Sequence, residues 1–248
     1  MESNPNQKKA WFSSWFDTKY YHILYKNRDE SEAELFISNL YKHLKLSNEQ
    51  VLDLACGKGR HSVTLNKLGL NVLGVDLSAQ SIACASQYQS ESLNFQEHDM
   101  REVIENKTFD VVFNLFTSFG YFDNEEDNFT VLRAIYEMLN PNGILVIDFM
   151  NATRILANLV KEETKTEDSI DFQLSRIFDG RFIKKNISFI DQGENYNFQE
   201  CVRGFTFEDF HSMLTQTNFK IESVFGDFQL SPFNAETSDR LILIARKL

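Results

Sequence analysis

The stretch that decides the fold is Val51-Leu52-Asp53-Leu54-Ala55-Cys56-Gly57-Lys58-Gly59-Arg60-His61-Ser62. Its apolar first part predicts a buried strand of a parallel sheet, and its two glycines allow a backbone to approach a ligand closely. Apolar residues at helical spacing follow as far as Gly69, which predicts a helix that ends there. A strand, a glycine turn and a helix in this order are typical of a unit that binds a nucleotide-like ligand at the start of the helix.

Two acids near this unit bear on the identity of the ligand. A second apolar run, 71–75, ends in Asp76, at the spacing where an acid can accept hydrogen bonds from a ribose. The pattern Gly57-x-Gly59-x-x-Ser62 is close to the fingerprint of nicotinamide dinucleotide sites. Asp53 argues against that ligand, because an acid directly before the glycines would repel a pyrophosphate and suits a cationic amino-acid group.

With these residues the sequence resembles the class I S-adenosylmethionine-dependent methyltransferases, whose first motif is acid-x-Gly-x-Gly-x-Gly. Asp53, Ala55, Gly57 and Gly59 match that motif, with Ala55 in place of the first glycine. The resemblance covers residues 50–150 with specific motifs and both flanks more loosely. It favours an S-adenosyl ligand over a dinucleotide.

The resemblance implies an α/β fold: a Rossmann-like, doubly wound sheet of seven mostly parallel strands with an antiparallel last strand, plus a small antiparallel β insertion. Apolar runs predict the five parallel strands at 51–54, 71–75, 93–96, 109–115 and 144–149. The helix, Asn-Pro-Asn-Gly turn and apolar strand over 125–149 are similar to the family's stretch between its fourth and fifth strands. A terminal antiparallel hairpin is expected from 219–225 and 241–245, with the last strand placed between the fifth and the sixth.

Three regions are expected along the chain. They are an N-terminal helical lid over 1–47, a cofactor-binding methyltransferase domain over 48–150 and 204–248, and an antiparallel β insertion over 151–203 that serves as a substrate lid. Turns such as Asp179-Gly180 between apolar runs indicate hairpins in the insertion. Residues Glu30 to Leu44 have a 3.6-residue apolar period and predict a core-facing helix. The aromatic segment 11–25 before it fits either a helix over the cofactor mouth or simple packing on the sheet.

The resemblance assigns cofactor contacts to residues at successive strand ends. The first acid would orient the amino group, the glycine loop would face the methionine part, and the second acid would take the ribose hydroxyls. An acid and an apolar residue after the third strand would hold adenine, although the acid could instead cap the next helix. The residues after the fourth strand lie toward the sulfur. The predicted cofactor-binding residues are Asp53, Ala55, Cys56, Gly57, Gly59, Asp76, Leu77, Asp99, Met100, Asn114 and Phe116.

The implied chemistry needs no catalytic triad. S-adenosylmethionine is an activated electrophile, so methyl transfer is an in-line displacement, and the protein must align the nucleophile, exclude water and remove a proton where needed. His61 and Tyr121 are weak candidate bases, and a packing or capping role for His61 is equally open. The substrate-binding candidates are Tyr20, Tyr21, Arg28, Tyr121, Arg154, Glu200 and Arg203. The five histidines lack metal-ligand spacing, so no metal is expected.

The composition of the chain narrows the class of molecule that can be the methyl acceptor. The 248 residues carry a net charge of −11, which argues against a large nucleic-acid surface because phosphate binding needs clustered Lys and Arg. The three cysteines are odd in number and have no Cys-x-x-Cys spacing, which speaks against disulfide bonds. The sequence also has no signal-peptide pattern and no apolar run long enough to span a membrane. These features predict a reduced, cytoplasmic protein. We expect methylation of a nitrogen or oxygen of a small molecule, with S-adenosylhomocysteine as the second product. A protein or RNA acceptor, a non-catalytic S-adenosylmethionine sensor or partner subunit, and a nicotinamide dehydrogenase are the alternatives that the sequence leaves open.

Overall fold

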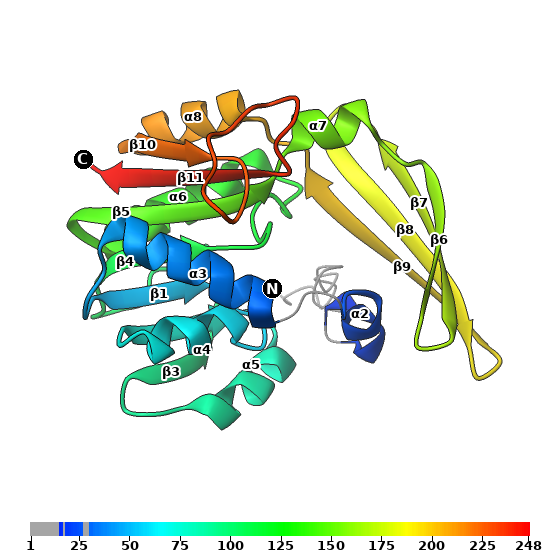
Figure 1. Cartoon of the computed structure of the whole chain (residues 1–248), viewed down its shortest axis with the longest axis horizontal. Helices are drawn as coiled ribbons and strands as arrows, with labels where there is room; N and C mark the ends of the chain where they lie inside the picture. Colours follow the sequence, from blue (N-terminus) through cyan, green and yellow to red (C-terminus); the bar gives the residue numbers. More distant parts are fainter. Residues whose placement is uncertain (1–14, 17, 27–29) are drawn as a thin grey trace, which may run out of the picture. The chain divides into compact units, whose positions relative to one another are not determined.

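The computed structural model describes residues 15–16, 18–26 and 30–248. The chain divides into two compact units (Figure 1). The small unit consists of Met1–Asn27 and Leu159–Val202, and the large unit of Arg28–Asn158 and Arg203–Leu248. In the part of the chain that the structure describes, no helix is long and apolar enough to cross a membrane.

A seven-stranded sheet forms the centre of the large unit (Figure 1). Its spatial order is β10-β11-β5-β4-β1-β2-β3. The strands are β1 (Gln50–Leu54), β2 (Asn71–Asp76), β3 (Leu93–Glu97), β4 (Phe109–Asn114), β5 (Leu139–Met150), β10 (Phe219–Phe225) and β11 (Arg240–Lys247). The first five pair in parallel, and β11 runs antiparallel to both β5 and β10. The predicted Rossmann-like topology, with the last strand inserted beside the fifth, is therefore confirmed.

Helices connect these strands, and side-chain caps begin several of them. They are α3 (Glu30–Leu44), α4 (Arg60–Lys67), α5 (Ala79–Ala85) with the 3₁₀ turn η1 (Ser86–Tyr88), α6 (Glu125–Met138), α7 (Ala152–Ala157) and α8 (Phe207–Gln216). Ser78 caps α5, Asn124 caps α6, and Thr206 forms a reciprocal capping box with Asp209 at α8. These side-chain oxygens accept backbone N–H groups that have no partner inside the helix.

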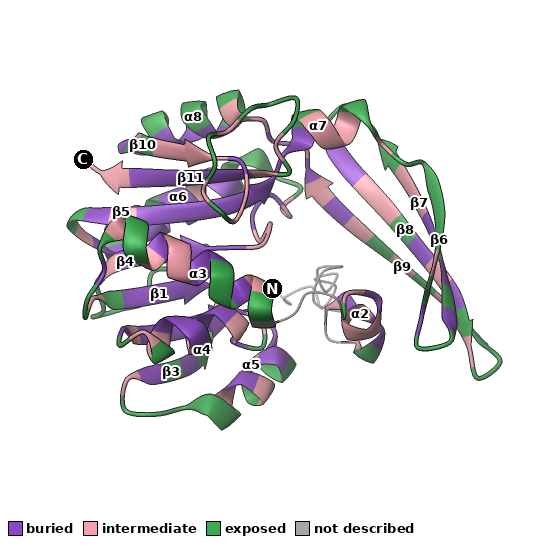
Figure 2. Cartoon of the chain, viewed as in Figure 1, coloured by how far each residue is buried: buried purple, intermediate pink, exposed green. Residues whose placement is uncertain are grey.

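The central strands are buried almost throughout, as purple ribbons in Figure 2 show. This explains their continuous apolar runs, which are typical of a parallel sheet covered on both faces. Phe95 of β3 packs so closely on the chain at Gly59 and Gly74 that a Cβ atom at either glycine would lie 2.7–2.8 Å from its ring. Gly59 therefore has a packing reason to be glycine, in addition to its predicted place beside the cofactor.

The small unit contains a four-stranded sheet on which helix α2 (Lys19–Leu24) packs. The sheet has the order β6-β7-β8-β9, from β6 (Glu162–Glu167), β7 (Ile170–Phe178), β8 (Phe182–Asp191) and β9 (Glu194–Arg203), and neighbouring pairs β6–β7 and β7–β8 are antiparallel. Trp15 and Tyr20 pack with Phe172 and Phe189 in an aromatic core. Residues 15–16 and 18–25 of the aromatic segment therefore pack on the sheet of the small unit, and a place over the cofactor mouth stays a prediction.

Two carboxylates hold the N-terminal segment on this sheet. Glu200 accepts hydrogen bonds from Trp15 Nε1 at 2.8 Å and from the Tyr25 hydroxyl at 2.7 Å. Asp191 accepts from the Tyr20 hydroxyl at 2.8 Å. Helix α3, which the sequence grouped with this segment in a lid over 1–47, lies in the large unit, whereas α2 lies in the small one. The role of the small unit as a substrate lid stays a prediction.

Candidate functional site

The loop after β1 has an unusual backbone. Ala55, Gly57 and Gly59 all have positive φ, of 64°, 56° and 82°. For Ala55 this is the left-handed region that favours glycine, so the loop keeps there the conformation that a glycine would adopt more easily. A Cβ atom built on Gly57 meets nothing within 4 Å. The loop therefore presents open space at Gly57, where a ligand can approach the backbone, and a packed surface at Gly59.

Three acids lie at or just after the carboxyl ends of three neighbouring strands, at the same edge of the sheet. The register pairs Asp53 with Gly74 and Asp76 with Glu97, and Asp99 comes two residues after β3 ends. Because β1, β2 and β3 are parallel, their carboxyl ends meet at one edge, where ligands bind in sheets of this kind. The negative charge of Asp76 acts on the carboxyl of Asp53, which places these two acids near each other.

Asp53 is buried, at 1% exposed, and accepts a hydrogen bond of 2.5 Å from the Ser62 hydroxyl of α4. Burial raises the pKa of the Asp53 carboxyl to about 6, the Ser62 hydrogen bond opposes this, and the charge of Asp76 adds to it. An acid with a raised pKa in such a place is stabilised in its charged form by a nearby cation. Asp53 is thus suited to a positively charged group of a ligand.

Asp76 organises the backbone of both adjoining loops. Its carboxylate accepts from the N–H of Gly57 at 2.8 Å and from the N–H of Ser78 at 2.8 Å. The first of these bonds ties the end of β2 to the glycine loop after β1. The next residue, Leu77, is 41% exposed, so its apolar side chain is available to pack against a flat ring of a ligand. Asp76 therefore holds the glycine loop in shape.

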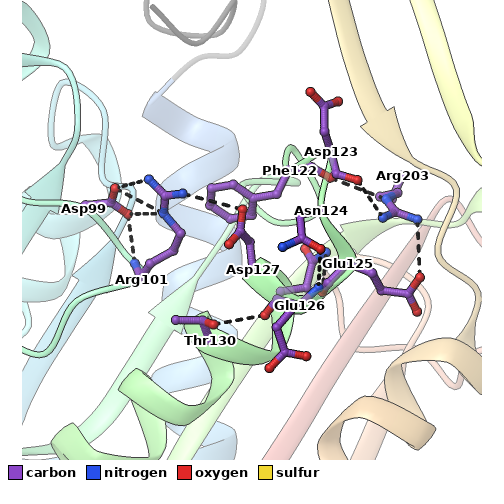
Figure 3. A network of polar contacts seen from close by, with 11 residues as sticks. Asp99, Arg101, Phe122, Asp123, Asn124, Glu125, Glu126, Asp127, Thr130 and Arg203 are labelled. Carbon is purple, nitrogen blue, oxygen red and sulfur yellow. Dashed lines mark hydrogen bonds and ion pairs between the residues drawn. The ribbon is translucent and has the colours of Figure 1, made fainter. Parts of the chain in front are cut away.

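Asp99 lies in a charged network that Figure 3 shows from close by. Arg101 Nη2 donates to its carboxylate at 2.6 Å, and the same guanidinium lies 3.5 Å from Asp127 at the start of α6. The Arg101 group also lies over the ring of Phe122, 5.0 Å from its centroid. The Arg101 guanidinium thus lies close to two acids, Asp99 and Asp127.

The end of β4 has an orphaned polar atom. Asn114 is 1% exposed, and its Nδ2 donates to the carbonyl of Leu54 at 3.0 Å. Its Oδ1 has no hydrogen-bond partner among the residues that the structure describes. A buried polar atom without a partner costs free energy unless a ligand or water satisfies it. Asn114 Oδ1 is therefore a candidate acceptor for a ligand's donor group.

An acid and an arginine that the sequence analysis did not select complete this edge. Asp148, buried near the end of β5, accepts from Arg240 Nε at 2.8 Å and from the N–H of Phe116 at 2.8 Å. Arg240 also donates from Nη2 to the Thr117 hydroxyl at 3.0 Å. Phe116 and Thr117 both have positive φ, so this pair holds a strained turn directly after β4. The sequence signal was an acid inside the apolar run Ile-Leu-Val-Ile-Asp.

The substrate candidates fall in both units. Glu200 and Tyr20 have partners inside the small unit, as described above, and Tyr21 lies half-buried beside Trp15. In the large unit, Arg203 is 4% exposed, and its guanidinium donates hydrogen bonds to the carbonyls of Phe122 and Asp123. Arg154 is ion-paired with Asp239, and Tyr121 is half-buried. Arg28 lies outside the described residues. Contact of these side chains with a substrate stays a prediction.

His61 is buried at the start of α4, with Nε2 3.3 Å from Arg60 Nη2. Burial, and then the charge of Arg60, lower its pKa to about 3. A group with so low a pKa accepts a proton poorly at neutral pH, which weighs against a general base. The packing role that the sequence left open for His61 agrees better with this environment.

We expect His61 to make the folded protein sensitive to acid. Its pKa is lower in the folded than in the unfolded chain, so its contribution is complete above pH 6.5 and is lost as the pH falls toward 3. Between pH 7.5 and pH 5 the wild-type free energy of unfolding should fall by about 2 kcal/mol more than that of His61→Gln. Urea denaturation at the two pH values measures the difference, and equal pH slopes for the two proteins would contradict it.

The sequence of this chain is similar to those of known proteins. The model of a sequence family described as a methyltransferase domain matches residues 51–143. YqeM of Bacillus subtilis (strain 168), whose name assigns it provisionally as a methyltransferase, is 31% identical over 215 residues, which are 80% of this chain and 84% of YqeM. A glycine/sarcosine N-methyltransferase of Aphanothece halophytica is 28% identical over 229 residues, or 89% of this chain and 83% of that protein.

Solved structures share the fold. A S-adenosylmethionine-dependent methyltransferase from Clostridium acetobutylicum ATCC 824 has a TM-score of 0.78 at 19% identity and covers 92% of this chain and 96% of its own. CalS10 with bound S-adenosylmethionine, an amino pentose methyltransferase from Micromonospora echinaspora, has a TM-score of 0.68 at 18% identity over the full length of both chains.

Proposed function

Because the chain belongs to the class I S-adenosylmethionine-dependent methyltransferases and takes S-adenosylmethionine as its cofactor, we propose that it transfers a methyl group to a nitrogen or oxygen atom of a small molecule. The relatives that act on glycine and sarcosine support a small acceptor. The free cysteines Cys56, Cys84 and Cys201 support a reducing compartment such as the cytoplasm.

The observation that carries this proposal is the set of acids at the carboxyl ends of β1, β2 and β3, together with the open space beside Gly57. Asp53, Asp76 and Asp99 lie at or just after the carboxyl ends of three adjacent parallel strands, and the glycine loop after the first strand leaves space beside its backbone. Asn114 Oδ1, which no described residue satisfies, adds a buried acceptor at the end of β4. These residues fit a ligand that has cationic, hydroxyl and amino groups along its length.

Each residue then has a task. When bound, S-adenosylmethionine supplies a methyl group on a sulfonium, which is already a good leaving group. Asp53 would hold the charge of the amino group, Asp76 would accept from the ribose hydroxyls, and Asp99 would accept from the adenine amino group after Arg101 moves to Asp127. The backbone at Gly57 would allow the close approach. The protein contributes alignment and exclusion of water, which account for a large part of such a rate enhancement.

We expect Asp76→Ala to weaken binding of S-adenosylhomocysteine by about 1–3 kcal/mol, because hydroxyl donors and the Gly57 N–H would lose their acceptor. Isothermal titration calorimetry measures the change. Asp110→Ala is a matched control: Asp110 also accepts two hydrogen bonds, from the Gln50 N–H and from Asn140, but at the opposite edge of the sheet. An unchanged affinity in Asp76→Ala, or an equal loss in the control, would remove Asp76 from the site.

Transfer of an isotopically labelled methyl group tests the function itself. The full chain is incubated with methyl-labelled S-adenosylmethionine and, separately, with a small-molecule extract, a protein fraction and an RNA fraction. The proposal predicts label in the small-molecule fraction, on nitrogen or oxygen, and less label with Asp76→Ala. Label only in protein or RNA would overturn the acceptor class. Cofactor binding without any transfer would favour a sensor.

A further inference from the structure

Arg240 occupies an unusual place for an arginine of the last strand. Because β11 is antiparallel to β5, its first residue pairs with Met150 and so lies at the edge where the parallel strands end. The strand thus delivers a guanidinium to the same edge as the cofactor-binding residues, beside Phe116 and Thr117.

One edge of this guanidinium is held firmly. Nε donates to Asp148 at 2.8 Å and Nη2 donates to the Thr117 hydroxyl at 3.0 Å. Asp148 is itself fixed, because it is buried and accepts from the Phe116 N–H on its other oxygen. The rings of Phe116 and Phe228 each lie 5.7 Å from the guanidinium carbon. The group is therefore oriented before any ligand arrives, which lowers the entropy lost on binding.

The opposite edge of the Arg240 guanidinium has N–H donors that are not used in these two hydrogen bonds. A guanidinium has five N–H donors, and within residues 15–16, 18–26 and 30–248 only those on Nε and Nη2 donate to Asp148 and Thr117. The side chain is 18% exposed, so a ligand can reach it. The free Nη1 and Nη2 positions form the planar fork that matches a carboxylate in two parallel hydrogen bonds.

Charge favours a singly charged anion there. Asp148 already balances one unit of positive charge on Arg240, but a second guanidinium, Arg60, lies 4.9 Å from the centroid of the Phe116 ring. Arg60 lies 3.6 Å from Glu32, a longer distance than the 2.8 Å between Arg240 and Asp148. A planar monoanion adds less negative charge beside Asp148 than a dianionic phosphate would.

We propose that the free edge of Arg240 is a binding site for a carboxylate, which rests on the function proposed above. Two carboxylates could reach it: the one on the amino-acid end of the cofactor, and one on the acceptor. In the second case the acceptor belongs to the small carboxylic acids that have a nucleophilic nitrogen or oxygen.

Arg240→Lys tests the site, since lysine keeps the charge beside Asp148 and loses the fork. The matched control is Arg246→Lys, on the same strand but at its other end, where the guanidinium pairs with Glu222 and the Asn142 carbonyl. Each protein is titrated by calorimetry with S-adenosylhomocysteine and with 5′-methylthioadenosine, which lacks the amino-acid end. Acetate is then titrated into each protein saturated with S-adenosylhomocysteine.

The two sources give different patterns. If the site takes the cofactor's carboxylate, Arg240→Lys weakens S-adenosylhomocysteine about 10- to 100-fold and leaves 5′-methylthioadenosine unchanged. If it takes the acceptor's carboxylate, both nucleosides bind as in the wild type and acetate binding is lost. Equal weakening of both nucleosides, or no change in any titration relative to Arg246→Lys, overturns the proposal. Failure of the wild type to bind either nucleoside would instead sink the proposed function.

Discussion

A Gly57→Val protein should lose binding of S-adenosylhomocysteine, by more than about 100-fold, because the branched side chain would fill the space that the ligand needs. In the wild-type chain a Cβ at this position meets nothing within 4 Å, and φ is +56°. A valine there adds backbone strain of about 1–2 kcal/mol on its own. Calorimetry measures the affinity, and thermal unfolding shows whether the variant folds.

Gly180→Val separates obstruction from strain. Gly180 also has a positive φ, of +91°, and open space around its Cβ position, but it lies in the turn between β7 and β8 of the small unit. The control should bind as the wild type does. Gly57→Ala, which is less strained and less bulky, provides a second test, with a smaller loss of affinity. Retained affinity in a folded Gly57→Val protein would show that the ligand lies elsewhere.

Asp148→Ala should lower the free energy of unfolding by about 2–4 kcal/mol. It leaves Arg240 without its ion-pair partner and the Phe116 N–H without an acceptor, in a place where Asp148 is 1% exposed. Removing one partner of a largely buried pair is costly, because the Arg240 charge that remains is only partly rehydrated. Urea denaturation measures the loss.

Two further variants test the reason for that loss. Glu222→Ala breaks the Arg246 pair, in which both side chains are about one third exposed, and should cost at most about 1 kcal/mol. Replacing Asp148 and Arg240 together by Leu and Met should recover part of the stability, since no unpaired charge stays buried. Equal losses for Asp148→Ala and Glu222→Ala would contradict a special role for the buried pair.

Local sequence patterns predicted most of the large unit. The helix Glu30–Leu44 and the helix Phe207–Gln216 with its Thr206 cap have the expected bounds, because apolar periodicity and a capping side chain act within a few residues. The parallel strands were predictable because burial on both faces demands continuous apolar runs. Their order also follows the family resemblance.

The elements and contacts that were not predicted depend on distant partners. Strand β6, Glu-Glu-Thr-Lys-Thr-Glu, has no apolar alternation, and it is a strand because β7 pairs with it. The short helix α7 was likewise not predicted. Asp148 and Arg240 are 92 residues apart, and Trp15 and Glu200 are 185 apart, so only the sheet order and the packing of α2 bring them together. The spacing of residues along the chain therefore does not predict such contacts.

One titration tests the central claim most directly: that the acids at the carboxyl ends of β1, β2 and β3 hold an S-adenosyl ligand. The full chain is titrated by calorimetry with S-adenosylhomocysteine and, separately, with NAD. We predict saturable one-to-one binding of S-adenosylhomocysteine that Gly57→Val abolishes, and no binding of NAD. Binding of NAD without any affinity for S-adenosylhomocysteine would contradict it.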